Sequence, residues 1–283
     1  MSAPLPRYAV FGHPVAHSLS PRLHALFSAQ TGIALEYVAI DAAPADFLHT
    51  AHAFFAAGGR GANVTLPHKR AAFALADVHS ATAQRLGVAN VLTRLDDGRV
   101  AADSNDGAAM LADLRARCGG DPHGRNVLLL GAGGAARAAA FALLDARAKT
   151  LVIANRTFER AQALAEALAR PDRVCLSRWD ALDRCAPFDL IVNATSAGVQ
   201  RAALALPHSL AHAGTIAYDL SYAGAARPFL EWARAARCAY AFDGLGMLVE
   251  TAADSFLHWH GVRPDADAAL RVLAPHRAYG NPD

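Results

Sequence analysis

The sequence predicts an α/β protein with two domains, one of them built on a doubly wound parallel sheet. Short apolar runs alternate with Ala- and Leu-rich helical segments between Asn126 and about Ala241, which is the pattern of repeated βαβ units. The apolar run 127–130 leads directly into the glycine-rich turn Gly131–Gly134, and helix-favouring sequence follows. The length of 283 residues leaves enough chain for a second domain.

The first part of the chain also alternates between predicted strands and helices. Strands are expected at 8–11, 36–40, just before Pro67 and at 87–93, and helices at 47–57, from near His68 and from near Ala108. Asp96-Asp97-Gly98 predicts a hairpin turn. We expect Ser20 to cap a helix that ends at Gly32, because a hydroxyl N-cap followed by Pro21 is a strong helix start.

The second part of the chain predicts six strands that are separated by helices rich in Ala, Leu, Arg and Glu. Each strand is a short apolar run, as in a buried parallel sheet. The expected strands are 127–130, 151–154, 173–176, 189–192, 215–218 and 238–241, and a last helical segment is expected at Met247–Trp259.

The turn Gly131-Ala132-Gly133-Gly134-Ala135 has the features of a dinucleotide-binding turn. The first glycine allows a tight turn, and Gly133 leaves room for a pyrophosphate against the backbone. Ala136 stands at the third glycine position, which this fingerprint tolerates. The start of the following helix offers N–H groups and a positive dipole end to phosphates. An ordinary strand-to-helix turn is the alternative, and the end of the next strand decides between the two.

That strand end indicates NADP rather than NAD. An NAD enzyme places Asp or Glu on the ribose hydroxyl about 20 residues past the glycines. Here the sequence is Asn155-Arg156-Thr157, with Arg160 in the next turn. Two guanidinium groups suit a 2′-phosphate. The alternative is a basic helix start that faces solvent, with Thr157 as N-cap, and the preceding glycine turn makes it the weaker interpretation.

Polar groups follow other predicted strands as well. Asn193, Thr195 and Ser196 follow one strand, and Tyr218-Asp-Leu-Ser-Tyr222 follows another, at the sheet edge where ligands bind in open α/β folds. Thr65 and Lys69 also lie at a strand end. From position alone, however, we favour a solvated lysine for Lys69, and turn and cap chemistry for Asp103–Asp106.

Composition excludes several classes of protein. The net charge is +2 without a block of Lys and Arg, so a nucleic-acid partner is not expected. No apolar run has the length of a membrane span, and the N-terminus lacks the features of a signal peptide. The 4 cysteines are scattered, which indicates reduced thiols and a cytoplasmic location. His258 and His260 are spaced so that they would not share a helix face, so no metal site is expected.

Together, these motifs resemble the shikimate dehydrogenase family in their order and spacing. The resemblance runs from residue 8 to about residue 264. It is carried by Ser18-Leu-Ser20-Pro21, Asn63-Val-Thr65-x-Pro67-x-Lys69, Asn90, Asp106-Gly107, Gly131 to Ala135, Asn155-Arg-Thr157, Asn193-Ala-Thr-Ser196, Tyr218-Asp219, Tyr222 and Asp243-Gly-Leu-Gly-Met247.

The resemblance implies a Rossmann-type NADP domain at 107–242 and a discontinuous α/β substrate-binding domain at 1–106 and 243–283. It implies reversible NADPH-dependent reduction of 3-dehydroshikimate to shikimate, a step of aromatic amino acid biosynthesis, with Lys69 and Asp106 as the catalytic pair. The implied substrate-binding residues are Ser18, Ser20, Thr65, Asn90, Asp106, Tyr222 and Thr251. The implied cofactor-binding residues are Gly131, Ala132, Gly133, Gly134, Ala135, Asn155, Arg156, Thr157, Arg160, Thr195, Ser196, Leu220 and Gly244. The hydride comes from the cofactor, so the chemistry requires no metal.

The sequence departs from the family pattern near the implied substrate site. The family usually has Thr where this chain has Val91, Asn-Thr in place of Ser104-Asn105, and often Phe in place of His68. Thr251 replaces a glutamine that touches substrate hydroxyls, so a hydrogen bond is expected to be lost or made through water.

Two alternatives to shikimate dehydrogenase activity therefore stay open. One is a relative that prefers quinate or another hydroxylated ring acid, and the other is a non-catalytic NADP-binding regulator. The expected partner is a small-molecule substrate, with no nucleic acid and no membrane, and the chain is expected to be a monomer or homodimer.

Overall fold

The computed structural model describes residues 4–118, 120–197 and 204–274. These residues form two compact units, hereafter unit 1 (4–105 and 248–274) and unit 2 (106–247). Residues 1–3 and 275–283 of the predicted substrate-binding domain, and 119 and 198–203 of the predicted NADP domain, lie outside the described residues. Within the described part of the chain, no helix is both long and apolar enough to cross a membrane.

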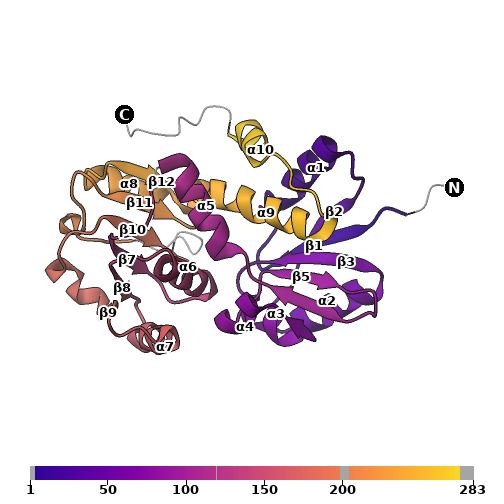
Figure 1. The fold of residues 1–283 in the computed structure, drawn as a ribbon, viewed down its shortest axis with the longest axis horizontal. Coiled ribbons are helices and arrows are strands. Elements are labelled where there is room, and N and C mark those ends of the chain that lie inside the picture. The colour runs from indigo at the N-terminus through magenta and orange to yellow at the C-terminus, as the bar shows by residue number, and fades with distance from the viewer. Residues whose placement is uncertain (1–3, 119, 198–203, 275–283) are drawn as a thin grey trace. The chain divides into compact units, whose positions relative to one another are not determined.

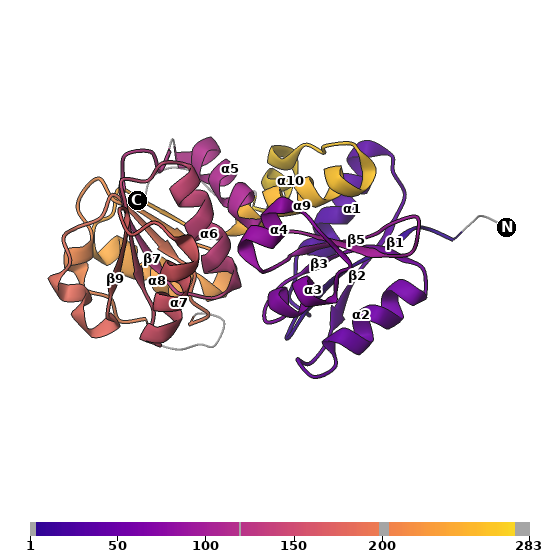
Figure 2. The same ribbon diagram turned by 60° about the horizontal axis from the view of Figure 1, so that its bottom comes forward.

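Unit 1 is a six-stranded mixed sheet with helices on both faces (Figure 1 and Figure 2). The strand order is β2-β1-β3-β5-β6-β4, and β5 runs antiparallel to β3 and β6. The strands are β1 (Arg7–Gly12), β2 (Glu36–Asp41), β3 (Gly59–Val64), β4 (Val78–His79), β5 (Val91–Arg94) and β6 (Val100–Asp103). The helices are α1 (Ser20–Thr31), α2 (Phe47–Ala56), α3 (Lys69–Leu75), α4 (Ala81–Leu86), α10 (Ala266–Leu273) and, from Leu248 on, α9 (Leu245–His260).

Alternate residues of β1 supply the two cores of unit 1. Phe11 is fully buried and packs edge-on against Phe47 and Phe54 of α2. Tyr8 faces the other side, where its ring lies 4.8 Å from that of Trp259 in α9. Because side chains alternate along a strand, the apolar residues of β1 cover both faces, as a central strand requires.

Unit 2 is a doubly wound parallel sheet, which confirms the predicted fold class. The strand order is β12-β11-β10-β7-β8-β9. Strands β8 and β9 are added on one side of β7 and strands β10 to β12 on the other, as in a Rossmann fold. The strands are β7 (Asn126–Leu130), β8 (Thr150–Ala154), β9 (Val174–Ser177), β10 (Leu190–Asn193), β11 (Ile216–Asp219) and β12 (Tyr240–Phe242), and each overlaps its prediction. The helices include α5 (Asp106–Cys118), α6 (Gly134–Asp145), α7 (Phe158–Leu168) and α8 (Arg227–Ala235).

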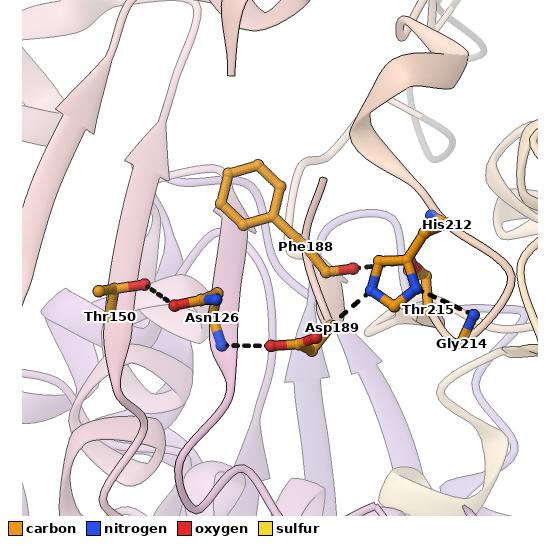
Figure 3. Close-up of polar contacts among 7 residues, drawn as sticks. All are labelled: Asn126, Thr150, Phe188, Asp189, His212, Gly214 and Thr215. Atoms are coloured by element: carbon orange, nitrogen blue, oxygen red, sulfur yellow. Dashed lines mark hydrogen bonds and ion pairs between the residues drawn. The ribbon is translucent and has the colours of Figure 1, made fainter. Parts of the chain in front are cut away.

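A hydrogen-bonded network connects the amino ends of the strands in unit 2 (Figure 3). Asp189 accepts hydrogen bonds from the main-chain N–H of Asn126 (2.7 Å) and from His212 Nε2 (3.3 Å). The Gly214 N–H donates to His212 Nδ1 at 3.0 Å, so the ring proton is on Nε2. Thr150 Oγ1 donates to Asn126 Oδ1 at 2.9 Å. These contacts lie at the edge opposite the glycine turn, so we assign them a structural role.

Asp189→Ala is expected to destabilise unit 2 by about 1–3 kcal/mol, because the Asn126 N–H loses its acceptor. Chemical denaturation followed by tryptophan fluorescence measures this loss. Asp172→Ala is the matched control, since it removes an exposed carboxylate that pairs with Arg170 and Arg173, and it should cost less than about 1 kcal/mol. Equal losses in the two variants would contradict the role given to Asp189.

Two local predictions were wrong. Leu19, not Ser20, is the N-cap of α1, and Ser20 is the first helical residue. The Ser18 hydroxyl instead accepts from the Ser20 N–H at 3.2 Å. The strand expected at 87–93 begins only at Val91, because Gly87 adopts a left-handed conformation (φ 62°) that ends α4. Thr157 is the N-cap of α7, as in the alternative interpretation of this segment, but its side chain makes no capping hydrogen bond.

Candidate active site

Four segments of unit 1 meet at one edge of its sheet. They follow β1, β3 and β6 and precede β5, whose antiparallel direction places its start at this same edge. Main-chain hydrogen bonds join the segments, from Thr65 N–H to Phe11 O (2.8 Å) and from Asn90 N–H to Asp103 O (3.0 Å). The predicted residues gathered along this edge are Ser18, Ser20, Thr65, Lys69 and Asn90.

Lys69 is buried, so the interpretation as a solvated surface lysine is wrong. It is the first residue of α3 and only 8% exposed. Its carbonyl accepts a hydrogen bond from the Ala89 N–H at 2.9 Å, which ties it to the segment that carries Asn90. A cation is seldom buried at a helix start without a reason, since desolvation and the helix dipole both oppose it. Burial here favours a chemical role.

His68 packs against the first residue of α2. Its ring stacks on Phe47 with centroids 4.5 Å apart, and its Nε2 lies 2.8 Å from Ala42 O. A carbonyl can only accept, so Nε2 carries the proton. Burial lowers the pKa of His68, which keeps the ring neutral. The departure from Phe at this position is thus an aromatic packing contact with one added hydrogen bond.

Asp106 and Tyr222 belong to unit 2. Asp106 is the first residue of α5 and is 4% exposed. A Cβ on the next residue, Gly107, would lie 2.6 Å from Ala138 O of α6, so close packing of α5 on α6 requires glycine there. Tyr222 follows β11. The motif Asp106-Gly107 therefore combines a buried carboxyl with a fixed helix start.

The glycine turn of unit 2 fits a dinucleotide. Gly131 has φ +109°, and a Cβ there would lie 2.8 Å from Ala194 O. A Cβ at Gly133 would meet nothing within 4 Å, so the backbone is open to a ligand. Gly133 is also the N-cap of α6 and offers no side-chain acceptor to its first N–H groups. These groups suit a pyrophosphate, and Ala136 is fully buried beneath them.

A pocket of about 260 Å³ lies at the ends of β8 and β9, where the 2′-phosphate was predicted. Its lining comprises Asn155, Arg156, Phe158, Arg178, Trp179 and Asp180. Arg156, Thr157 and Arg160 are exposed on the same segment. Arg178 and Trp179 were not predicted as site residues, although they directly follow β9 at the ligand edge of the sheet. A cationic pocket with an aromatic wall fits the phosphorylated adenosine end of NADP.

The ends of β10, β11 and β12 form the other part of this edge. Asn193 Nδ2 donates to Asp219 Oδ2 at 2.8 Å, and the Thr195 hydroxyl donates to Asn193 Oδ1 at 2.8 Å. A Cβ on Gly244 would lie 2.3 Å from Leu220 O, so these two predicted cofactor residues are adjacent and the position requires glycine. Ser196 lies beyond Thr195 on the same connection.

Asp219 makes stability pH-dependent. Burial raises its pKa to about 7 from 3.8, although hydrogen bonds from Ser221 and Asn193 act in the opposite direction. Between these two values the folded state retains a proton that the unfolded chain has lost, so the free energy of unfolding falls as pH rises from about 4 to about 7. Asp219→Asn should therefore lose less stability than wild type over this range. Urea denaturation midpoints of both proteins across the range measure it, and parallel pH dependences would contradict the assignment.

The strand order of unit 2 and its open glycine turn are those of a dinucleotide-binding protein. Residues 10–92 match the family described as "Shikimate dehydrogenase substrate binding domain", and residues 113–204 match "Shikimate / quinate 5-dehydrogenase". A protein of Xanthomonas campestris pv. campestris (strain B100) named "Shikimate dehydrogenase (NADP(+))" is 56% identical over 272 residues, which cover 95% of this chain and 96% of that protein. The chain belongs to the shikimate dehydrogenase family.

Solved structures agree with this assignment. The Ael1 enzyme from Pseudomonas putida is 42% identical, with a TM-score of 0.85, and the match covers 95% of this chain and 98% of that one. Shikimate 5-dehydrogenase from Thermus thermophilus, in complex with NADP(H) and shikimate, is 34% identical with a TM-score of 0.81, and the match covers 96% of this chain and 99% of that one.

Proposed function

We propose that this protein catalyses the reversible NADPH-dependent reduction of 3-dehydroshikimate to shikimate, a step of aromatic amino acid biosynthesis. The observation that carries the proposal is 56% identity, across 95% of the chain, to a protein named as an NADP-dependent shikimate dehydrogenase. The buried Lys69 and the open glycine turn support it independently of that likeness.

We assign substrate binding to 1–106 with 243–283, and NADP binding to 107–242. Ser18 and Ser20 offer hydroxyls to the substrate carboxylate. Thr65, Asn90 and Thr251 bind the rest of the substrate, together with Tyr222 from 107–242. Gly131 to Ala135 hold the pyrophosphate of the cofactor. Asn155, Arg156, Thr157 and Arg160 hold the 2′-phosphate. Leu220 and Gly244 border the nicotinamide, and Thr195 and Ser196 bind the cofactor at the same sheet edge.

The proposed chemistry needs one positioned proton donor. NADPH, when bound, supplies the hydride that adds to the carbonyl carbon. The carbonyl oxygen gains negative charge during hydride transfer. The Lys69 ammonium stabilises this charge and donates a proton to that oxygen. In the reverse direction the amine takes the proton back. Asp106 is the second member of the proposed catalytic pair.

A second candidate is a relative that prefers quinate. Thr251 in place of glutamine favours it, because a shorter side chain leaves more room and one hydrogen bond fewer for the ring substituents. The matched description "Shikimate / quinate 5-dehydrogenase" names both substrates. A non-catalytic regulator has weaker support, since both members of the proposed catalytic pair are retained and buried.

Oxidation of shikimate and of quinate by NADP⁺, each measured over a range of substrate concentrations, tests the proposal. We expect kcat/KM for shikimate to exceed that for quinate by at least about 10-fold, the effect of one or two hydrogen bonds to the ring substituents. A reversed ratio would favour the second candidate, and no turnover of either substrate would favour the regulator.

We also propose a cytoplasmic location and a monomer or homodimer. Free thiols at Cys175, Cys185 and Cys238 support the cytoplasm, because an oxidising compartment would favour their pairing or modification. Cell fractionation and light scattering test these two points.

A further inference from the structure

The side chain of Asn105 connects Asn90 to helix α9 within unit 1. Its Oδ1 accepts from Asn90 Nδ2 at 2.7 Å, and its main-chain N–H donates to Asn90 Oδ1 at 2.9 Å. At its other end, Asn105 Nδ2 donates to Thr251 O at 3.0 Å and lies 3.3 Å from Ser255 Oγ. Asn105 thus holds both polar atoms of the Asn90 carboxamide and two groups of α9.

These partners leave each carboxamide only one orientation. The Thr251 carbonyl can only accept, so the nitrogen of Asn105 must face it and the oxygen must face Asn90. The main-chain N–H of Asn105 can only donate, so the oxygen of Asn90 must face it and the nitrogen must face Asn105 Oδ1. Turning either amide would bring two donors or two acceptors together. The network therefore determines the orientation of Asn90.

The network is anchored on both sides. Ser255 Oγ donates to Thr251 O at 2.8 Å and accepts from Asn63 Nδ2 at 2.8 Å, and Tyr37 OH donates to Asn63 Oδ1 at 2.8 Å. Asn63 is 8% exposed and Asn90 is 2% exposed. Buried amides that lose a partner are costly, so a connected network of this kind holds its members rigidly.

We propose that Asn105 is a positioning residue for substrate binding: it fixes the Asn90 carboxamide at the substrate edge of unit 1 and sets its place relative to the Thr251 turn of α9. This inference rests on the substrate-binding role proposed for Asn90. Asn105 acts through Asn90 and thereby supports substrate affinity in a chain whose α9 carries only a threonine at position 251.

A double-mutant cycle between Asn90→Ala and Asn105→Ala tests the inference. Affinity for shikimate is measured by calorimetric titration, and kcat and KM are measured separately. Asn105→Ala should weaken shikimate binding and raise KM by about 5- to 30-fold, the loss of one or two hydrogen bonds, with kcat within about 3-fold of wild type. In the Asn90→Ala background, removing Asn105 should have little further effect on affinity.

Ser255→Ala is the matched control, because it removes a partner of Asn105 on α9 and leaves both contacts with Asn90. It should change shikimate affinity by less than about 3-fold. If Asn105→Ala does not fold, Asn105→Ser leaves a smaller cavity and should show the same loss of affinity.

The outcomes separate this inference from the proposed function. If Asn90→Ala has no effect on shikimate binding, the proposed site is wrong and the inference falls with it. If Asn90→Ala weakens binding but the two losses add, or if Asn105→Ala and its serine substitute bind normally, the proposed site stands and the positioning role is overturned. An effect of Ser255→Ala as large as that of Asn105→Ala would make Asn105 an anchor of α9 only.

Discussion

Lys69→Ala should lower kcat by about 10²–10⁴, the range typical of losing a general acid–base group. The loss should fall on kcat more than on KM, because the lysine acts most strongly on the charge that develops in the transition state. Steady-state kinetics of wild type and variant measure it. Titration with NADP⁺ checks that the cofactor site is unchanged.

Arg70→Ala is the matched control for Lys69. Arg70 is the next residue of α3, and it is exposed where Lys69 is buried. It should keep kcat within about 2-fold of wild type, as expected for an exposed charge. Near-normal kcat in Lys69→Ala, or an equal loss in both variants, would remove Lys69 from the proposed catalytic pair.

The double variant Arg156→Gln with Arg160→Gln should raise KM for NADP by about 10- to 100-fold, since each guanidinium would lose a charge-assisted hydrogen bond to the 2′-phosphate. KM for NAD should change by less than about 3-fold, because NAD lacks that phosphate. Parallel kinetics with the two cofactors measure the difference.

Arg170→Gln with Arg173→Gln controls for the loss of surface charge. These arginines precede β9, whereas the cofactor edge follows it. Their removal should change KM for both cofactors by less than about 2-fold, the effect of a screened surface charge. If the Arg156 and Arg160 variant changed KM for NADP and KM for NAD equally, the two arginines would not be binding the 2′-phosphate.

The parallel sheet of unit 2 could be predicted because its signals are local. The apolar run before Gly131 is fully buried, and glycine is required at Gly131 by its φ and by its contact with Ala194. Helix α4 was missed because six residues carry little periodicity, and its glycine C-cap was taken into a strand. The cap of α1 was assigned wrongly because Ser20 suits an N-cap by residue type, whereas the N-cap is Leu19, which makes no side-chain capping hydrogen bond and is not marked by any local preference.

Several features of the candidate site could not be predicted either, because they depend on contacts between residues far apart in the sequence. Position alone favoured a solvated Lys69, and only the packing of α3 against the segment before Asn90 shows that it is buried. The contacts of Asn105 with Thr251 and Ser255 join residues 146 and 150 positions apart, so no local pattern predicts them. Arg178 and Trp179 line the candidate cofactor pocket from a strand end where no glycine or familiar motif marks them.

The most direct test of the proposed function is the reduction of 3-dehydroshikimate by the purified protein with NADPH, with the product identified by mass spectrometry and 3-dehydroquinate assayed in parallel. We expect one NADPH to be consumed for each shikimate formed, with a higher kcat/KM for 3-dehydroshikimate than for 3-dehydroquinate. NADPH binding without oxidation in the presence of 3-dehydroshikimate would contradict it.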